Sequence, residues 1–298
     1  MAIDLNRGSA GIELPKNLSS EIWADTLKES VVQQLATKAN LPAGGSTIQT
    51  ITGEPEAEWV AETDPKPVGT HTFGSKTLQP YKMALIEPFS DEFRRDLPAL
   101  YRELATRLPF ALGRLFDKTV FGEVAAPGAN FDTLADAPAI ALDGTTKPYF
   151  DALKAVSSQK GDITGWALTP GAEIEAMQAV DTTGRPLLMS NLTSEGAIGS
   201  ILGRPVRKFD SFGGSDLAGI AGQWSQAKWG MVEGIKISES SEATVTLADG
   251  TNLNLWQRNM FAVRVEVEMG FNVRDINRFV KLTDGATGTT PGDEGTEG

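Results

Sequence analysis

The chain has 298 residues, of which 40% are hydrophobic and 22% charged, a composition typical of a folded protein. No stretch approaches the roughly 18 consecutive apolar residues of a membrane-spanning helix, and the first six residues do not resemble a signal peptide. We therefore expect a soluble protein made in the cytoplasm, without a membrane partner. There is no cysteine, which excludes disulfides, thiolate metal sites and thiol nucleophiles. The net charge of −12 disfavours direct reading of a nucleic-acid sequence, although a container for nucleic acid can be acidic.

The first predicted element is an amphipathic helix over residues 19–39. It begins at a hydroxyl cap and ends before a stretch that contains proline and glycine. Its apolar residues recur every four positions. They are Trp23, Leu27, Val31 and Leu35. An extended arm, residues 1–17, leads into this helix.

Strand-like segments at 47–52, 58–62 and 73–86 surround a turn-rich stretch at 63–69, which predicts a long β-hairpin. Neither face of its second strand is cleanly apolar. Because isolated two-stranded hairpins are marginally stable in water, we expect this one to lie on a neighbouring subunit. The alternative is an ordinary edge hairpin with two solvated faces.

A second helix begins after the cap at Ser90. Apolar residues follow at spacings of three and four, and the main segment runs over 98–122, a rod of about 37 Å. Pro109 is expected to kink it, since a proline inside a helix removes a backbone hydrogen bond. The apolar series is Phe93, Leu97, Leu100, Leu104, Leu108, Ala111 and Leu115.

Short alternating elements follow a loop at 123–147 and predict an α+β domain. Helices are expected over 148–158 and 170–180, and strands over 165–168, 201–209, 220–224 and 229–238. Ala248 to Thr251 is typical of a tight hairpin turn, because Asp-Gly tolerates positive φ angles.

Residues 259–271 show the clearest period of two in the chain. Phe261, Val263, Val265 and Val267 alternate with polar or small residues, so one face of a strand about 40 Å long is buried. The strand matches the second helix in length, and the two are expected to form one elongated slab. Residues 283–298 are rich in glycine, threonine and acids, and we expect a disordered tail.

No constellation of residues indicates catalysis, a cofactor or a metal ion. His71 is the only histidine and stands without partners in the sequence. The glycines at 44–45 and 213–222 do not form a phosphate-binding motif. Trp224 and Trp229 fit a sugar-stacking platform, but core packing is the more common role of such residues. The sequence therefore favours a protein that is not an enzyme.

Taken in order, these segments resemble the Hong Kong 97-type major capsid proteins of tailed double-stranded-DNA phages. The resemblance covers most of the chain. It rests on 14–36 for the N-terminal arm and helix, 58–62 with 73–82 for the extended hairpin or E-loop, and 90–93 with Asp96 and Asp117 for the spine helix. It also rests on 181–188 and 201–206 for the axial domain and 258–266 for the long strand of the peripheral domain.

The resemblance implies a Hong Kong 97-type α+β fold with an N-terminal arm and helix over 1–46 and an E-loop over 47–87. The peripheral domain would comprise 88–135 and 252–272, and the axial domain 136–251 and 273–283, followed by a disordered tail over 284–298. The expected peripheral core is Leu100, Leu104, Leu108, Leu115, Phe261, Val263, Val265 and Val267. The expected inter-subunit contacts of the E-loop are Trp59, Lys66, Phe73, Lys76 and Tyr81.

The function implied is a major capsid protein that assembles as pentamers and hexamers into an icosahedral head enclosing DNA. Its partners would be other copies of the chain, the portal protein and non-specifically packaged DNA. A separate scaffolding protein is also implied, because no built-in scaffold segment is visible ahead of the arm, unless the chain is already a processed product. The chain would be assembled in the host cytoplasm and found in the virion. An encapsulin-type compartment shell is the nearest alternative, and a hydrolase or carbohydrate-binding protein a remote one.

Overall fold

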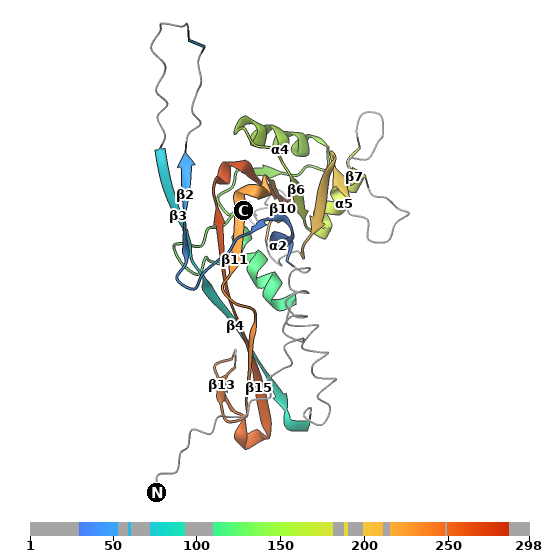
Figure 1. The fold of residues 1–298 in the computed structure, drawn as a ribbon. Coiled ribbons are helices and arrows are strands. Elements are labelled where there is room, and N and C mark those ends of the chain that lie inside the picture. The colour runs from blue at the N-terminus through green and yellow to red at the C-terminus, as the bar shows by residue number, and fades with distance from the viewer. Residues whose placement is uncertain are drawn as a thin grey trace, which may run out of the picture. The chain divides into compact units, whose positions relative to one another are not determined.

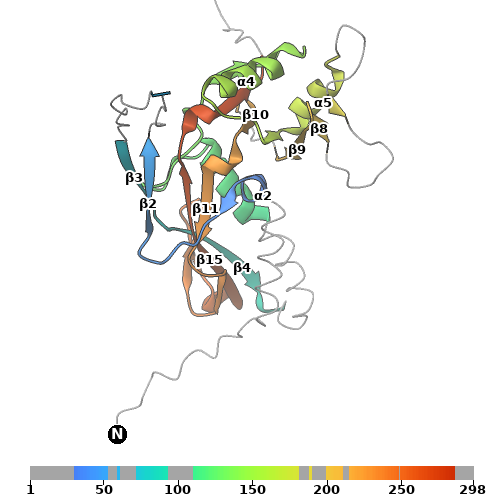
Figure 2. The ribbon, with the colours of Figure 1, turned by 45° about the horizontal axis from the view of Figure 1, so that its top comes forward.

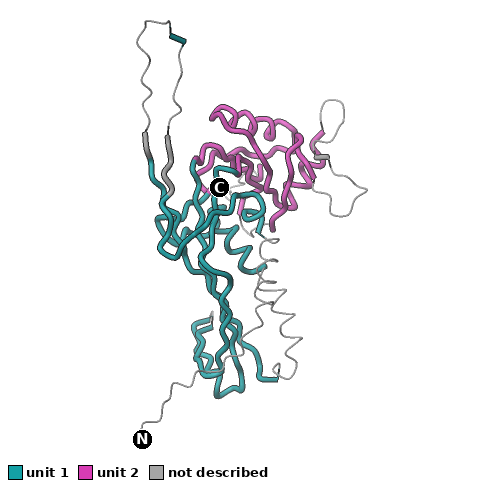
Figure 3. The backbone as a smooth tube through the Cα atoms, in the orientation of Figure 1, with its two compact units in different colours: residues 1–133, 225–274 teal, residues 134–224, 275–298 magenta. Residues whose placement is uncertain are grey.

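The computed structural model describes residues 30–52, 59–60, 72–92, 110–180, 188–189, 199–210, 215–247 and 249–285. The chain divides into two compact units, which Figure 3 colours separately. Unit 1 contains residues 1–133 and 225–274, and unit 2 contains residues 134–224 and 275–298. Both units combine helices with β-sheet, as an α+β fold requires.

The centre of unit 1 is β15 (Met260–Val273), the long strand that the alternating pattern predicts (Figure 1). It pairs antiparallel with β4 (Tyr81–Ser90) along ten positions. Its other edge carries β12 (Lys236–Ser240) and β11 (Ala227–Met231), and β1 (Thr37–Lys38) pairs with β11 in parallel. All odd-numbered residues of β15 are buried, so this face forms part of the core.

Residues 225–251 fall in unit 1, whereas the sequence led us to expect them in the axial domain. The reason is that β11 and β12 pair with β15 and thereby join its sheet. Two further short strands, β13 (Thr244–Thr246) within this stretch and β14 (Asn252–Asn254) just after it, form a separate hairpin. Its connecting turn contains Gly250 at φ +82°, as expected from the Asp-Gly pair. A 3-10 turn, η3 (Trp256–Arg258), leads into β15.

Residues 110–121 are helical, and the helix ends at Gly122, whose φ of +88° suits glycine. Its buried apolar residues are Leu112, Phe116, Val120 and Phe121. The predicted series is therefore wrong in this segment, because it placed Leu115 in the core, and Leu115 is 38% exposed. The predicted series kept the same helical spacing through Pro109 and therefore included Ala111 and Leu115. In the structure, Leu112 and Phe116, each one position later, occupy the core. Leu100, Leu104 and Leu108 lie outside the described residues.

The N-terminal helix ends earlier than predicted. α2 spans Val31–Leu35, and Thr37 and Lys38 form β1 instead of a last helical turn. The edge of β11 provides backbone partners for an extended chain, since Ala39 N donates to Trp229 O at 2.7 Å. The predicted helical residues 19–29 lie outside the described part of the chain.

The predicted hairpin is present as β2 (Ser46–Thr52) and β3 (Thr72–Leu78), paired from Ser46↔Leu78 to Thr52↔Thr72. The single strand predicted over 73–86 is wrong, because it is interrupted at Gln79 and Pro80 before β4. At these two residues the chain stops pairing with β2 and begins to pair with β15. The backbone passes so close to β15 that a Cβ atom on Gly270 would lie 2.5 Å from Gln79 O.

Unit 2 is built on a seven-stranded sheet with the order β5-β16-β10-β6-β9-β8-β7. The strands are β5 (Ala139–Ala141), β6 (Gly165–Leu168), β7 (Leu188–Met189), β8 (Ser200–Ile201), β9 (Arg204–Lys208), β10 (Leu217–Gly222) and β16 (Phe279–Thr283). The 3-10 turns η2 (Trp224–Gln226) and η4 (Ile276–Arg278) follow β10 and precede β16. α4 (Lys147–Ser158) packs against β5 and β16, and α5 (Pro170–Gln178) packs against β6, β7 and β10.

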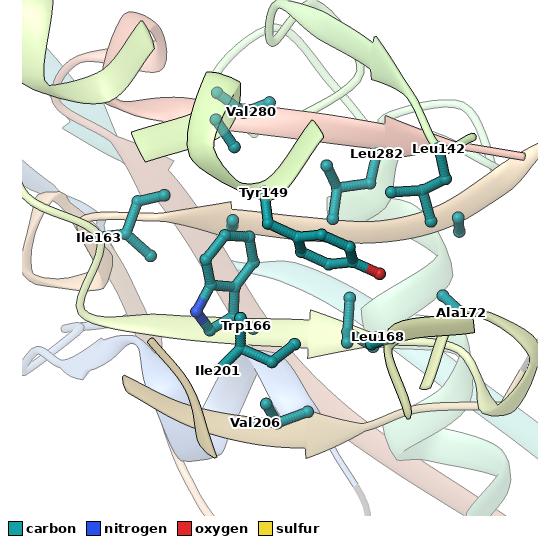
Figure 4. Packing of buried hydrophobic residues seen from close by; sticks show 14 of the residues in the cluster. Leu142, Tyr149, Ile163, Trp166, Leu168, Ala172, Ile201, Val206, Val280 and Leu282 are labelled. Atoms are coloured by element: carbon teal, nitrogen blue, oxygen red, sulfur yellow. The ribbon is translucent and has the colours of Figure 1, made fainter. Parts of the chain in front are cut away.

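Both helices contribute to one hydrophobic core (Figure 4). Tyr149 from α4 packs edge-on against Trp166 from β6, with ring centroids 5.7 Å apart. Trp166 shares the core with Val280 of β16 and with Ala172 of α5. The sheet therefore turns one face toward both helices.

Among the described residues, no helix is long and apolar enough to cross a membrane. The same residues contain no cluster of three or more His, Asp or Glu side chains arranged to hold a metal ion. His71 lies outside them.

Candidate assembly surfaces

The base of the β2–β3 hairpin is fixed to the rest of unit 1. Lys76 Nζ donates to Asp132 Oδ2 at 2.7 Å and to the carbonyl oxygen of Val273 at 2.5 Å. The same carboxylate oxygen accepts a hydrogen bond from Val273 N at 2.8 Å. Leu78, at the end of β3, is fully buried. The base of the hairpin is therefore attached to the rest of unit 1.

The hairpin and the segment that connects its strands carry exposed polar and apolar groups. Thr47 and Ser75 are exposed on the strands. Trp59 is fully exposed and Val60 is exposed beside it. A tryptophan buries roughly 150–250 Å² when it finds a partner, which corresponds to about 4–6 kcal/mol of hydrophobic stabilisation. An exposed tryptophan of this kind is a candidate residue for contact with another molecule.

A buried carboxylate attaches the N-terminal helix to helix 110–121. Asp117 accepts hydrogen bonds from Ser30 Oγ at 2.7 Å, Val31 N at 2.9 Å and Val32 N at 3.2 Å. Ser30 Oγ in turn accepts a hydrogen bond from Gln33 N, so both side chains cap α2. Burial raises the pKa of Asp117 to about 7, and the three hydrogen bonds oppose this rise. These hydrogen bonds therefore attach α2 to helix 110–121.

A groove of about 320 Å³ lies between β4, helix 110–121 and the loop that follows the helix. Its lining is mostly apolar and includes Met83, Leu115, Val124, Phe131 and Met269. Tyr81 stands at its side, where the ring packs edge-on against Phe131 and the hydroxyl accepts a hydrogen bond from Asn130 N at 3.2 Å.

The expected E-loop contact residues fall into three groups. Trp59 is free to contact another molecule. Lys76 and Tyr81 instead have partners within their own chain. Lys76 holds the base of the hairpin, and Tyr81 packs at the side of the groove. Phe73 pairs with Ile51 in the hairpin backbone, and Lys66 lies outside the described residues.

Four expected core residues of the long strand, Phe261, Val263, Val265 and Val267, are buried. Trp224 and Trp229 are buried as well, so they do not form a sugar-stacking platform. Sequence reasoning missed Ser30 and Asp132, which hold the two attachments described above. A serine and an aspartate carry no periodic signal, and their partners are 87 and 141 residues away along the chain.

This architecture is shared with phage capsids of the Hong Kong 97-type fold. A structure from Gordonia phage Cozz has a TM-score of 0.68 at 21% identity, with 87% of each chain covered. A native GTA particle capsid computed with C5 symmetry has a TM-score of 0.60 at 13% identity and covers 96% of this chain and 95% of its own.

Sequence comparison identifies the family. The model of the phage capsid family matches residues 10–284. "Probable major capsid protein gp17" of Mycobacterium phage L5 is 31% identical over 285 residues, which cover 89% of this chain and 87% of the relative. The "Major capsid protein" of Staphylococcus phage 80alpha is 22% identical over 94% of this chain and 88% of its own length. The chain belongs to the phage capsid family.

Proposed function

We propose that this chain is the major capsid protein of a tailed phage, and that its copies assemble as pentamers and hexamers into the icosahedral head around double-stranded DNA. Family membership over residues 10–284 supports this function. The relatives at 31% identity, in Mycobacterium phages L5 and D29, are named probable major capsid proteins. These relatives favour a phage head over an encapsulin-type compartment.

The observation that carries the proposal in the structure is the β2–β3 hairpin. Its base is held by Lys76, Asp132 and Val273, whereas Trp59 has its whole side chain exposed. An attached base combined with an exposed apolar side chain supports a role as an element that is completed by another subunit. The hairpin and the residues around it, 47–87, would then act as the E-loop, with Lys66 and Phe73 on the contacting part.

The two units would be the two domains that the family resemblance implies, with 225–251 assigned to the peripheral domain instead of the axial domain. Unit 1 contains β15 and helix 110–121 and would be the peripheral domain, with 1–46 as its N-terminal arm and helix. Unit 2 would be the axial domain. Portal protein and a separate scaffolding protein would be the other partners in the host cytoplasm. Because the chain has a net charge of −12, which does not favour binding to phosphates, its contact with the packaged DNA would be non-specific.

The full chain, expressed alone and together with the phage's scaffolding protein, tests this function by sedimentation and electron microscopy. We expect closed particles built from rings of five and six chains. Particles isolated from infected cells should contain nuclease-protected DNA. Particles that instead contain an enzyme as cargo would support the encapsulin-type alternative, and a chain that forms no rings or particles under any of these conditions would contradict the proposal.

A further inference from the structure

The chain passes between its two units at three places. Unit 1 comprises residues 1–133 and 225–274, so the chain crosses after 133, before 225 and after 274. We call the three stretches of unit 1 at these crossings the junction segments: 131–133, 225–227 and 272–274. They are far apart in the sequence, and any contact among them is therefore a product of folding.

Hydrogen bonds join the three junction segments to one another within unit 1. Arg274 N donates to Gln226 O at 2.9 Å. Ala227 pairs with Val273 in the ladder of β11 and β15. The carboxylate oxygen Oδ2 of Asp132 accepts a hydrogen bond from Val273 N at 2.8 Å. The three segments therefore meet at the C-terminal end of β15.

A lysine of the β2–β3 hairpin joins this group. Lys76 Nζ donates to Asp132 Oδ2 at 2.7 Å and to Val273 O at 2.5 Å, so it reaches two of the three junction segments. Lys76 lies in β3, which contacts β15. In Figures 1 and 2 the chain runs from β3 into β4, which pairs with β15. One side chain thus connects the hairpin to the junction segments.

The strength of this connection indicates what it can do. Asp132 Oδ2 accepts from both the Lys76 ammonium and Val273 N, so one carboxylate serves the hairpin and the end of β15 together. The side chain of Lys76 is 42% exposed and that of Asp132 28%. An ion pair that is exposed to this degree contributes little to the stability of a whole domain. It is better suited to transmitting a local change than to holding the fold.

We propose that Lys76 and Asp132 are positioning residues that couple the β2–β3 hairpin to the junction segments. When the hairpin is held closed, the junction segments open less often. Coupling between two sites is reciprocal, so closed junction segments also favour a closed hairpin. The claim that a neighbouring subunit is what holds the hairpin rests on the proposed shell function, whereas the coupling itself is a property of the single chain.

Amide hydrogen exchange in the unassembled full chain measures this coupling. Thr47→Cys and Thr77→Cys are introduced at directly paired positions of β2 and β3, where the Cβ atoms of two strands are about 5 Å apart. The chain has no other cysteine, so a short thiol cross-linker closes the hairpin specifically. Compared with the same chain whose thiols are blocked separately, the cross-linked chain should exchange the Arg274 amide about two- to fivefold more slowly, the range for an exposed ion pair.

The Arg274 amide is the informative position, because its hydrogen bond to Gln226 involves neither Lys76 nor Asp132. With Lys76→Met added, the cross-link should slow exchange in the hairpin and leave Arg274 unchanged. Asp132→Asn, which keeps an oxygen for Val273 N and removes the charge that holds Lys76, should have the same effect.

Lys82→Met is the matched control. Lys82 is a lysine of β4 in the same unit, and its carboxylate partners Glu266 and Glu268, at 3.9 and 3.7 Å, lie outside the junction segments. With this variant the cross-link should slow exchange at Arg274 as before.

Two results would overturn the coupling. The cross-link could leave Arg274 exchange unchanged in the chain that retains Lys76, or it could slow this exchange equally with Lys76→Met or Asp132→Asn. Neither result depends on assembly, so the shell function would stand. Failure of the full chain to form rings or particles would instead count against the shell function and leave the exchange result intact.

Discussion

The attachment of α2 to helix 110–121 should depend on pH through Asp117. The informative variant is Asp117→Asn, because asparagine retains an acceptor oxygen for Ser30 and cannot ionise. Burial holds the pKa of Asp117 at about 7 in the folded chain. An aspartate in an unfolded chain titrates at about 3.9. Between these two values the folded state keeps a proton that the unfolded state has lost, so stability falls as the pH rises and levels off above about 7.

The expected size follows from that window. Each pH unit within it changes the free energy of unfolding by about 1.4 kcal/mol. When the pH is lowered from about 8 to about 5.5, only roughly the last 1.5 pH units lie below the pKa of about 7 in the folded chain. The free energy of unfolding of the wild-type chain should therefore rise by about 2 kcal/mol on this acidification. Asp117→Asn should lack this gain.

Hydrogen exchange of the backbone amides of residues 31–33 measures the opening of α2 at each pH. Asp143→Asn is a suitable control, because the pKa of exposed Asp143 is lowered by hydrogen bonds from Thr145 and the residue stays ionised across this range. The control should follow the wild-type chain. If Asp117→Asn also follows the wild-type chain in its pH dependence, the ionisation of Asp117 does not govern this attachment.

Three further changes test other parts of the structure. Val265→Asp places an unpaired charge at a fully buried position of β15 and should cost several kcal/mol, comparable with a domain's whole stability. The variant should therefore be insoluble, whereas the control Arg264→Gln, on the exposed face of the same strand, should stay soluble. Trp59→Ser should leave the thermal transition of the unassembled chain unchanged and reduce the yield of particles seen by sedimentation; a normal yield would argue against an anchoring role. Ending the chain after Gly285 keeps every described contact and should leave particle formation intact, and loss of particles would assign a contact to the final residues.

Local patterns predicted the parts of the fold whose causes are local. The alternation from Phe261 to Phe271 predicted β15 to within two residues, because one face of this strand is buried along its length. The strand at 165–168 and the two helices of unit 2 were likewise predicted at nearly their observed bounds. Gly250 has the positive φ that the Asp-Gly pair indicated.

Features set by distant partners could not be predicted in the same way. Thr37 and Lys38 continue a helical pattern, but the edge of β11 draws them into a strand. The break at Gln79 arises because the chain changes partners from β2 to β15. Ser30 and Asp117 meet only through folding. On α5, the burial of Ala172 and Ala176 and the exposure of Ile174 depend on how the helix packs against the sheet. The family resemblance supplied the shell function, which no local pattern expresses.

A cryo-electron microscopy reconstruction of particles assembled from the full chain tests the central claim most directly. The account predicts a closed icosahedral shell in which unit 2 lies around fivefold and sixfold axes and Trp59 is buried against a neighbouring subunit. Assemblies that are not closed, or closed shells in which Trp59 remains in solvent and the β2–β3 hairpin contacts only its own chain, would contradict it.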